Sequence, residues 1–235
     1  MTSGVDPLAA KLILFDIDGT LLTSGGAGER ALRLGIKDRF GIDDDLKDIE
    51  IAGRTDSGIA RQLLRKHQLP ETAENFARFC DGYLHFLPKL LPETNGRLLP
   101  GVIPLLEALK ARPDVVLGLL TGNLERGAEI KLTHYGVWDY FEFGAYADDH
   151  HDRNELGRFA CARATEKHGR EFPAERIYVL GDTPHDIACA RAFGARAVGI
   201  ATGNFSVQQL AETQPDALFE DLSDLPRVLA ALDCH

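Results

Sequence analysis

The chain has 235 residues, a length that suits one large α/β domain or a core with a small accessory domain and excludes a single very small domain. Hydrophobic residues make up 44% and charged residues 26%, which is the balance of a globular protein and not of a disordered one. The formal net charge of -10 disfavours binding to nucleic acid or to anionic membranes, so any anion site needs local positive charge from a metal ion or from arginines.

Cysteine usage and the apolar runs indicate the compartment. The four cysteines are far apart and form no CxxC pair, which favours a reducing environment over a disulfide framework. The N-terminal MTSGVDPLAA lacks the basic and apolar regions of a signal peptide, and no apolar run approaches the ~18 residues of a membrane span. We therefore expect a cytoplasmic protein with no membrane partner.

The first predicted element is a strand at residues 11–15 (KLILF), because a short run that is apolar at every position is typical of a strand buried on both faces. The following segment, from about residue 25 to 96, shows helical periodicity at 28–40, 57–67 and 71–87 and no convincing strand. Glycine-rich or proline-containing stretches at 24–26 and 92–96 suit hinges. We expect a core of residues 1–22 and 97–235, interrupted by a helical cap of residues 23–96.

In the rest of the chain, strands and helices alternate. Short apolar runs at 115–120, 177–180 and 197–200 predict strands. Helical patterns precede or follow them at 102–111, 124–135, 155–168 and 184–193. This alternation predicts the α/β class, with a doubly wound parallel sheet.

Three of the predicted strands end in polar sequences, and in such sheets ligands bind beyond the carboxyl ends of the strands. The sequences are Asp16-Ile-Asp18-Gly-Thr20, Thr121-Gly-Asn123 and Gly181-Asp182-Thr-Pro-His-Asp186. Asp16 and Asp18 are two positions apart, so in extended chain both carboxylates face one site. Because like charges at this spacing repel, the pair favours a bound Mg²⁺, for which Asp182 offers a third protein oxygen.

This set of motifs, in this order over nearly the whole chain, resembles the haloacid dehalogenase (HAD) superfamily. The helical insertion after the first motif is similar to that of phosphoglycolate-phosphatase-like members. The resemblance implies a Rossmann-like core and a Mg²⁺-dependent phosphatase that hydrolyses a small phosphorylated metabolite through an aspartyl-phosphate. It implies Asp16 as the nucleophile and Asp18 as general acid and then base, roles that suit carboxylates. The implied metal ligands are the side chains of Asp16 and Asp182 and the backbone carbonyl of Asp18.

Further site residues follow from the resemblance. Thr121 matches a hydroxyl that binds a phosphoryl oxygen, with backbone donors at Gly122 and Asn123 near a helix N-terminus. Asn123 is also expected to cap that helix. Asp186 either reaches the metal or only caps its own helix, since Thr183 and Asp186 have capping-box spacing.

The basic residue of the family, a Lys in a Lys-Pro motif, has no direct counterpart. Arg153 lies near the corresponding position, where a helix should begin, and a guanidinium can bind a phosphoryl group and the nucleophile together. Arg158 is the rival, although it would lie a turn or more into the helix and face solvent. We prefer Arg153.

In the insertion, Gly53-Arg54-Thr55-Asp56 resembles a cap loop that faces the active site and helps to select substrates. Arg54 would bind an anionic group beyond the reacting phosphate, whereas Thr55 or Asp56 would cap the helix that follows. His150 and His151 are interpreted as part of a solvated loop and not as a transition-metal site.

Four other functions have some support in the motifs. A phosphosugar mutase of the same superfamily would keep both Asp16 and Asp18, so it stays open. A dehalogenase or a phosphonatase is disfavoured, because those relatives lack a counterpart of Asp18. A non-catalytic protein that binds a phosphometabolite is also disfavoured, because the acidic set is intact. The sequence leaves the substrate and the oligomeric state open.

Overall fold

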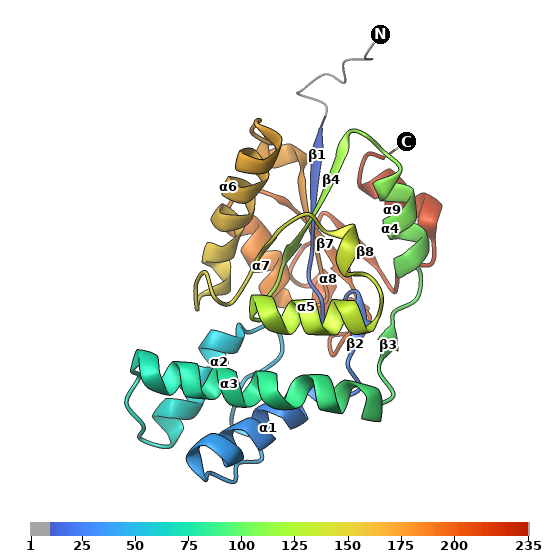
Figure 1. Cartoon of the computed structure of the whole chain (residues 1–235). Helices are drawn as coiled ribbons and strands as arrows, with labels where there is room; N and C mark the ends of the chain where they lie inside the picture. Colours follow the sequence, from blue (N-terminus) through green and yellow to red (C-terminus); the bar gives the residue numbers. More distant parts are fainter. Residues whose placement is uncertain (1–9, 235) are drawn as a thin grey trace.

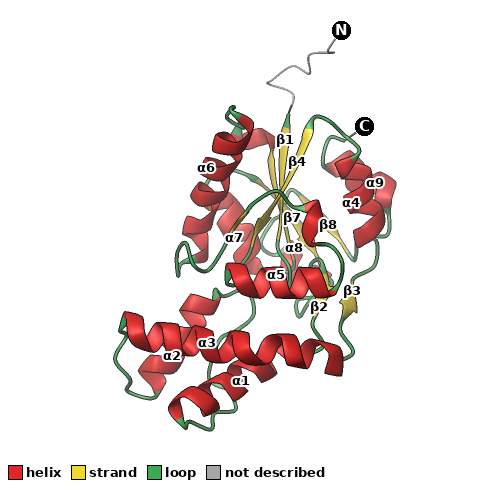
Figure 2. Cartoon of the chain, viewed as in Figure 1, coloured by secondary structure: helices red, strands yellow, loops and turns green. Residues whose placement is uncertain are grey.

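The computed structural model describes residues 10–234, and its central feature is a six-stranded parallel sheet with helices on both faces (Figure 1, Figure 2). The strand order β5-β4-β1-β6-β7-β8 places β1 inside the sheet, beside β4 and β6. This architecture confirms the predicted α/β class and Rossmann-like fold. The strands are β1 Lys11–Phe15, β4 Val115–Leu120, β5 Gly144–Ala145, β6 Ile177–Gly181, β7 Arg196–Ile200 and β8 Ala217–Phe219.

Six helices follow the strands or connect them. Helices α4 and α9 pack on one face of the sheet, and α6, α7 and α8 pack on the other. Helix α5 lies between the sheet and the helical insertion, where it contacts α3 (Figure 1). The helices are α4 Val102–Lys110, α5 Glu125–His134, α6 Leu156–His168, α7 Pro184–Ala192, α8 Val207–Ala211 and α9 Leu225–Ala231.

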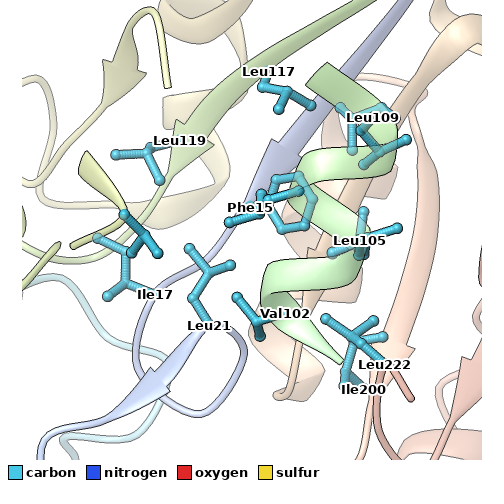
Figure 3. Close-up of a cluster of buried hydrophobic side chains, with 14 of the residues drawn as sticks. Phe15, Ile17, Leu21, Val102, Leu105, Leu109, Leu117, Leu119, Ile200 and Leu222 are labelled. Carbon is cyan, nitrogen blue, oxygen red and sulfur yellow. The ribbon is translucent and has the colours of Figure 1, made fainter. Parts of the chain in front are cut away.

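The central strand β1 is buried on both faces, as its continuous apolar run predicts. Ile13 and Phe15 belong to one hydrophobic cluster, and Leu12 and Leu14 belong to the cluster on the opposite face. Figure 3 shows Phe15 facing the side chains of α4, whose buried positions are spaced three or four residues apart. Each such side chain contributes about 1.5–3 kcal/mol on burial, so the two faces hold β1, and with it the residues that follow Phe15, in a fixed position.

The helical insertion has a hydrophobic cluster of its own and lies beyond one end of the sheet (Figure 1). Its helices are α1 Ala27–Phe40, α2 Asp56–Lys66 and α3 Ala73–Leu90. Helices α1 and α3 approach so closely that a Cβ added at Gly35 would lie 2.6 Å from the backbone of Gly82. Helix α3 runs beyond the predicted end at residue 87 and contains Pro88, which has no amide hydrogen to donate to the preceding turn.

Two short strands connect the insertion to the sheet. Strand β2 (Leu22–Thr23) pairs antiparallel with β3 (Arg97–Leu98), so the two segments that link the insertion to the core run side by side. They lie at the expected boundaries of the insertion, and the division into core and cap stays a prediction. Residues 1–9, which lack a signal-peptide pattern, lie outside the described residues. Within residues 10–234, no helix has the length and apolarity that crossing a membrane requires.

Candidate active site

The polar strand ends gather around a cavity of about 380 Å³ at the carboxyl edge of the sheet, between the sheet and the helical insertion. The core contributes Asp16, Asp18, Asp182 and Arg153 to its wall, and the insertion contributes Arg54, Asp56 and Tyr83. Gly122 and Asn123, which follow β4, also line the cavity. The expectation that these strand ends meet at one edge is therefore correct.

Three carboxylates form a compact group: oxygens of Asp16, Asp182 and Asp186 all lie within 4.8 Å of one another. Asp16 and Asp182 meet because β1 and β6 are adjacent and parallel, and the amide of Asp16 donates to the carbonyl of Leu180 at 2.9 Å. Gly19 has a φ of 86° and lies against Asp182, so a side chain at position 19 would collide with that carboxylate.

The negative charge of the three carboxylates exceeds the positive charge that Arg153 brings to them. Burial, with the charges of Asp186 and Asp18, raises the pKa of Asp16 to about 6, although Arg153 opposes this rise. Burial, together with the charges of Asp186 and Asp16, raises the pKa of Asp182 to about 9. A cluster of oxygen ligands with excess negative charge suits a hard divalent cation.

Arg153 precedes α6 and donates hydrogen bonds to two of these carboxylates. Its Nη2 donates to Oδ1 of Asp16 at 2.8 Å and also to Oδ1 of Asp186, while Nη1 donates to the carbonyl of Gly53 at 3.2 Å. The two carboxylates raise the pKa of the guanidinium further despite its burial. Arg158, by contrast, has a side chain that is 62% exposed and pairs with Glu155 at 3.1 Å. The structure thus brings Arg153 to the site and leaves Arg158 at the surface.

Asp186 both caps α7 and belongs to the acidic group. Its Oδ2 accepts hydrogen bonds from the amide and the hydroxyl of Thr183, at 2.9 and 2.7 Å, which completes a capping box. Its other oxygen, Oδ1, faces Arg153. The capping role is confirmed, and contact with a metal stays a prediction.

Asp18 is not a member of the acidic group, although the sequence spacing predicts that its carboxylate shares one ion with Asp16. Its Oδ2 instead accepts from Nζ of Lys131 at 2.5 Å and from Nδ2 of Asn123 at 2.9 Å. The ammonium of Lys131 attracts the Asp18 side chain toward α5. A metal-binding role for Asp18 stays a prediction for its backbone carbonyl only.

Thr121 is fully buried at the end of β4, and its Oγ1 accepts from Nδ2 of Asn123 at 2.9 Å. The hydroxyl proton of Thr121 is therefore free to donate to a ligand. The expected helix cap by Asn123 is wrong, because its side chain bonds Thr121, Asp18 and Lys131 instead. Oδ2 of Asp56 accepts from the amide of Leu124, the residue before α5, at 2.9 Å, and Oδ2 of Asp148 accepts from the first amide of α5 at 2.7 Å.

The family model for haloacid dehalogenase-like hydrolases matches residues 13–191, a span that contains the three polar strand ends and the helical insertion. The chain belongs to the haloacid dehalogenase-like hydrolase family. Among curated relatives, a probable phosphatase IndB from Dickeya dadantii is 26% identical, with 94% of each chain covered. A phosphoglycolate phosphatase from Synechococcus elongatus is 29% identical and covers 94% of this chain and 98% of its own.

Solved structures show the same fold. CbbY from Rhodobacter sphaeroides, solved in complex with phosphate, is similar with a TM-score of 0.76, 21% identity, and coverage of 95% of this chain and 99% of its own. A predicted phosphoglycolate phosphatase from Haemophilus somnus has a TM-score of 0.68 and 23% identity, and covers 94% of this chain and 98% of its own. At these identities the likeness supports the HAD fold alone.

The loop that precedes α2 forms hydrogen bonds between the insertion of this HAD hydrolase and its core. Thr55 is the N-cap of α2, as expected, and its hydroxyl also donates to the carbonyl of His151 at 2.6 Å. Asp56 is not that cap, because its carboxylate accepts from the amide of Leu124 and its amide donates to the carbonyl of Gly122 at 2.6 Å. Arg54 lines the cavity but pairs with Glu50, so its proposed contact with a substrate anion stays a prediction.

Sequence patterns missed Lys131, the residue of this HAD hydrolase that holds Asp18. Lys131 lies on α5 among the buried residues Gly127, Ala128 and Leu132, so a lysine on an apolar helix face was the available signal. Its ammonium also lies close to Asp56 and Tyr83 of the insertion. The negative charge of Asp18 and Asp56 outweighs burial and raises the pKa of Lys131.

Proposed function

We propose that this protein is a magnesium-dependent phosphatase that hydrolyses a small phosphorylated metabolite through an aspartyl-phosphate on Asp16. The observation that carries the proposal is the buried group of Asp16, Asp182 and Asp186, in which Arg153 is bonded to Asp16. Asp16, Asp182 and Arg153 line one cavity. The named phosphatases among the relatives support the same activity. Phosphoglycolate is the first substrate to test, because several relatives carry the name phosphoglycolate phosphatase.

The residues present fit a magnesium ion. Carboxylate oxygens are the ligands that Mg²⁺ prefers, and the raised pKa values of Asp16 and Asp182 indicate negative charge that a cation would offset. Asp16, Asp182 and Asp186 would hold the ion with their side chains, and Asp18 with its backbone carbonyl. When bound, the ion would neutralise charge on the phosphoryl group and orient it.

The side chains of the cavity then have separate tasks. Asp16 attacks phosphorus, and the bond from phosphorus to the ester oxygen breaks as the aspartyl-phosphate forms. Asp18 gives a proton to the leaving oxygen and later takes one from the water that releases inorganic phosphate. The guanidinium of Arg153 and the hydroxyl of Thr121 donate to phosphoryl oxygens, together with the amides of Gly122 and Asn123.

The insertion of residues 23–96 would act as the cap that excludes water and selects the substrate. It contacts the core through Thr55 and Asp56, of which Asp56 lines the cavity. In this proposal Arg54 offers positive charge to the part of the substrate that does not react.

A phosphate-release screen tests the proposal. We expect release of inorganic phosphate from at least one small phosphate ester in the presence of Mg²⁺, and a loss of at least about 100-fold with EDTA, because charge on the phosphoryl group is then not neutralised. The panel should contain phosphoglycolate, sugar phosphates and p-nitrophenyl phosphate. Isomerisation of a sugar phosphate without phosphate release would instead identify a mutase, and equal rates in EDTA would contradict the metal requirement.

A pair of arginine variants tests the phosphate-binding role of Arg153. We expect Arg153→Ala to lower kcat/KM by about 100-fold or more, since removal of one donor to a developing oxyanion typically costs about 10²–10³-fold. Arg158→Ala is the matched control, and it should stay within about twofold because its side chain faces solvent. Steady-state phosphate release measures both. The reverse order of effects would contradict the assignment.

A further inference from the structure

Lys131 is a buried cation at the boundary between the core and the insertion. Its side chain is 5% exposed, and the residues beside it on the inner face of α5 are glycine, alanine and leucine. Burial of an ammonium costs several kcal/mol unless hydrogen-bonded acceptors compensate for the lost water. Two acceptors are present at short range: Oδ2 of Asp18 at 2.5 Å and Oδ1 of Asn123 at 2.6 Å.

Lys131, Asn123 and Asp18 form a closed triangle of hydrogen bonds. Lys131 donates to Asp18 and to Asn123, and Nδ2 of Asn123 donates to the same oxygen of Asp18 at 2.9 Å. Nδ2 also donates to Thr121, which is fully buried directly after β4. The triangle is therefore anchored on one side to β4 and on the other to α5, and each member restricts the others.

Both hydrogen bonds to Asp18 reach Oδ2. Within residues 10–234, Oδ1 of Asp18 accepts no hydrogen bond, and the side chain is 39% exposed where it lines the cavity. An acid that must hand a proton to a leaving oxygen needs one free oxygen in a fixed direction. The triangle supplies this arrangement, because it occupies one oxygen and leaves the other for the substrate.

We propose that Lys131 is a positioning residue of the phosphatase: with Asn123 it fixes Oδ2 of Asp18, so that Oδ1 serves as the oxygen that exchanges protons with the leaving group and with water. This inference rests on the proposed function. It assigns to α5 a role that Lys131 shares with Asn123, which follows β4. Lys131 also lines the cavity, but its hydrogen bonds go to Asp18 and Asn123, so in this proposal it acts on the reacting atoms through Asp18.

The leaving group of the substrate provides the test. An alkyl phosphate needs a proton on its leaving oxygen, whereas p-nitrophenolate departs without one, so a defect that acts through the acid affects mainly the alkyl ester. We expect Lys131→Met to lower kcat/KM by about 30-fold or more for the best alkyl phosphate of the screen, and by less than about threefold for p-nitrophenyl phosphate. Lys110→Met is the control, because that lysine donates to a carbonyl at the surface and should leave both values unchanged.

The double variant Lys131→Met/Asp18→Asn shows whether Lys131 acts through Asp18 or independently of it. Asp18→Asn should show the same dependence on the leaving group, and Lys131→Met should slow Asp18→Asn by no more than about twofold, because coupled residues are not additive. A merely structural role of Lys131 would lower both ester activities together. If Lys131→Met does not fold by circular dichroism, Asn123→Ala removes the second donor to the same oxygen and should show the same signature.

Several results would overturn the inference. One such result is an equal loss of kcat/KM on the two esters in Lys131→Met, and another is an unchanged kcat/KM in that variant. A third is that Lys131→Met slows Asp18→Asn by the same factor as it slows the wild type. Each of these would leave the proposed function intact. A wild-type protein that releases no phosphate from any ester in Mg²⁺ would overturn both the proposed function and this inference. The expected pattern in all variants would support the inference that Lys131 and Asn123 orient the carboxyl group of Asp18.

Discussion

Replacement of Asp16 by Asn is expected to lower kcat by about 10⁴-fold or more while the protein keeps its fold. The amide is not a nucleophile toward phosphorus, so the covalent route is lost entirely. The fold should persist because Asn has nearly the same shape and keeps an oxygen that accepts from Arg153. Phosphate release and the covalently bound phosphate that survives acid quenching measure this result. Turnover near the wild-type rate would contradict the proposed nucleophile.

The same variant has an expected effect on stability, with a defined dependence on pH. The pKa of Asp16 is raised to about 6 in the folded protein, from about 3.9 in unfolded chains. The stability linked to its proton is therefore fully present below about pH 4 and is lost as the pH rises through about 6. Near pH 8, without metal, the ionised carboxylate should destabilise the wild type by up to about 3 kcal/mol.

Urea unfolding in EDTA measures this difference. We expect Asp16→Asn to have the higher free energy of unfolding near pH 8 and a difference from the wild type that shrinks toward pH 4. Asp81→Asn is a suitable control, because Asp81 is an exposed residue of α3 with only a distant ion pair. A variant that is less stable than the wild type near pH 8 would contradict the picture of an uncompensated buried charge.

The elements that position the site were predictable because their signals are local. Apolar runs that end at Phe15, Leu120 and Leu180 mark strands buried on both faces, and parallel strands place their carboxyl ends at one edge. That rule is enough to bring Asp16, Thr121 and Asp182 together. The edge strands β5 and β8 were missed because two or three residues are too few to show a period.

The side-chain contacts within the site were less predictable, because they depend on elements distant in sequence. Spacing alone directs Asp18 toward Asp16, yet Lys131, 113 positions later, turns its carboxylate toward α5. Likewise Asp56 resembles a cap for its own helix, but its carboxylate accepts from the amide of Leu124, 68 positions later, just before α5. In both cases the carboxylate bonds a residue that is distant in sequence and not the partner that the local pattern predicts. A single sequence does not show which distant residues come close in the fold.

Magnesium affinity is expected to increase steeply with pH, because the ion competes with protons for the same carboxylates. The pKa of Asp182 is raised to about 9 by burial and by the charges of Asp186 and Asp16. Below that value the metal-free site holds a proton on Asp182, and binding of Mg²⁺ must release it. The dissociation constant should therefore fall about tenfold per pH unit between about pH 6 and 9, and level off above.

Titration calorimetry of Mg²⁺ binding in two buffers of different protonation enthalpy checks this expectation. The difference between the two binding enthalpies gives the number of protons released. We expect about one proton near pH 7.5, and a second below about pH 6, where Asp16 is also protonated. Asp182→Asn should bind Mg²⁺ weakly, with no proton released near pH 7.5. A Mg²⁺ dissociation constant that does not change between pH 6 and 9 would show that Asp182 is already ionised in the metal-free protein. Arg153 would then have to offset the charge of all three carboxylates, although its hydrogen bonds reach only Asp16 and Asp186.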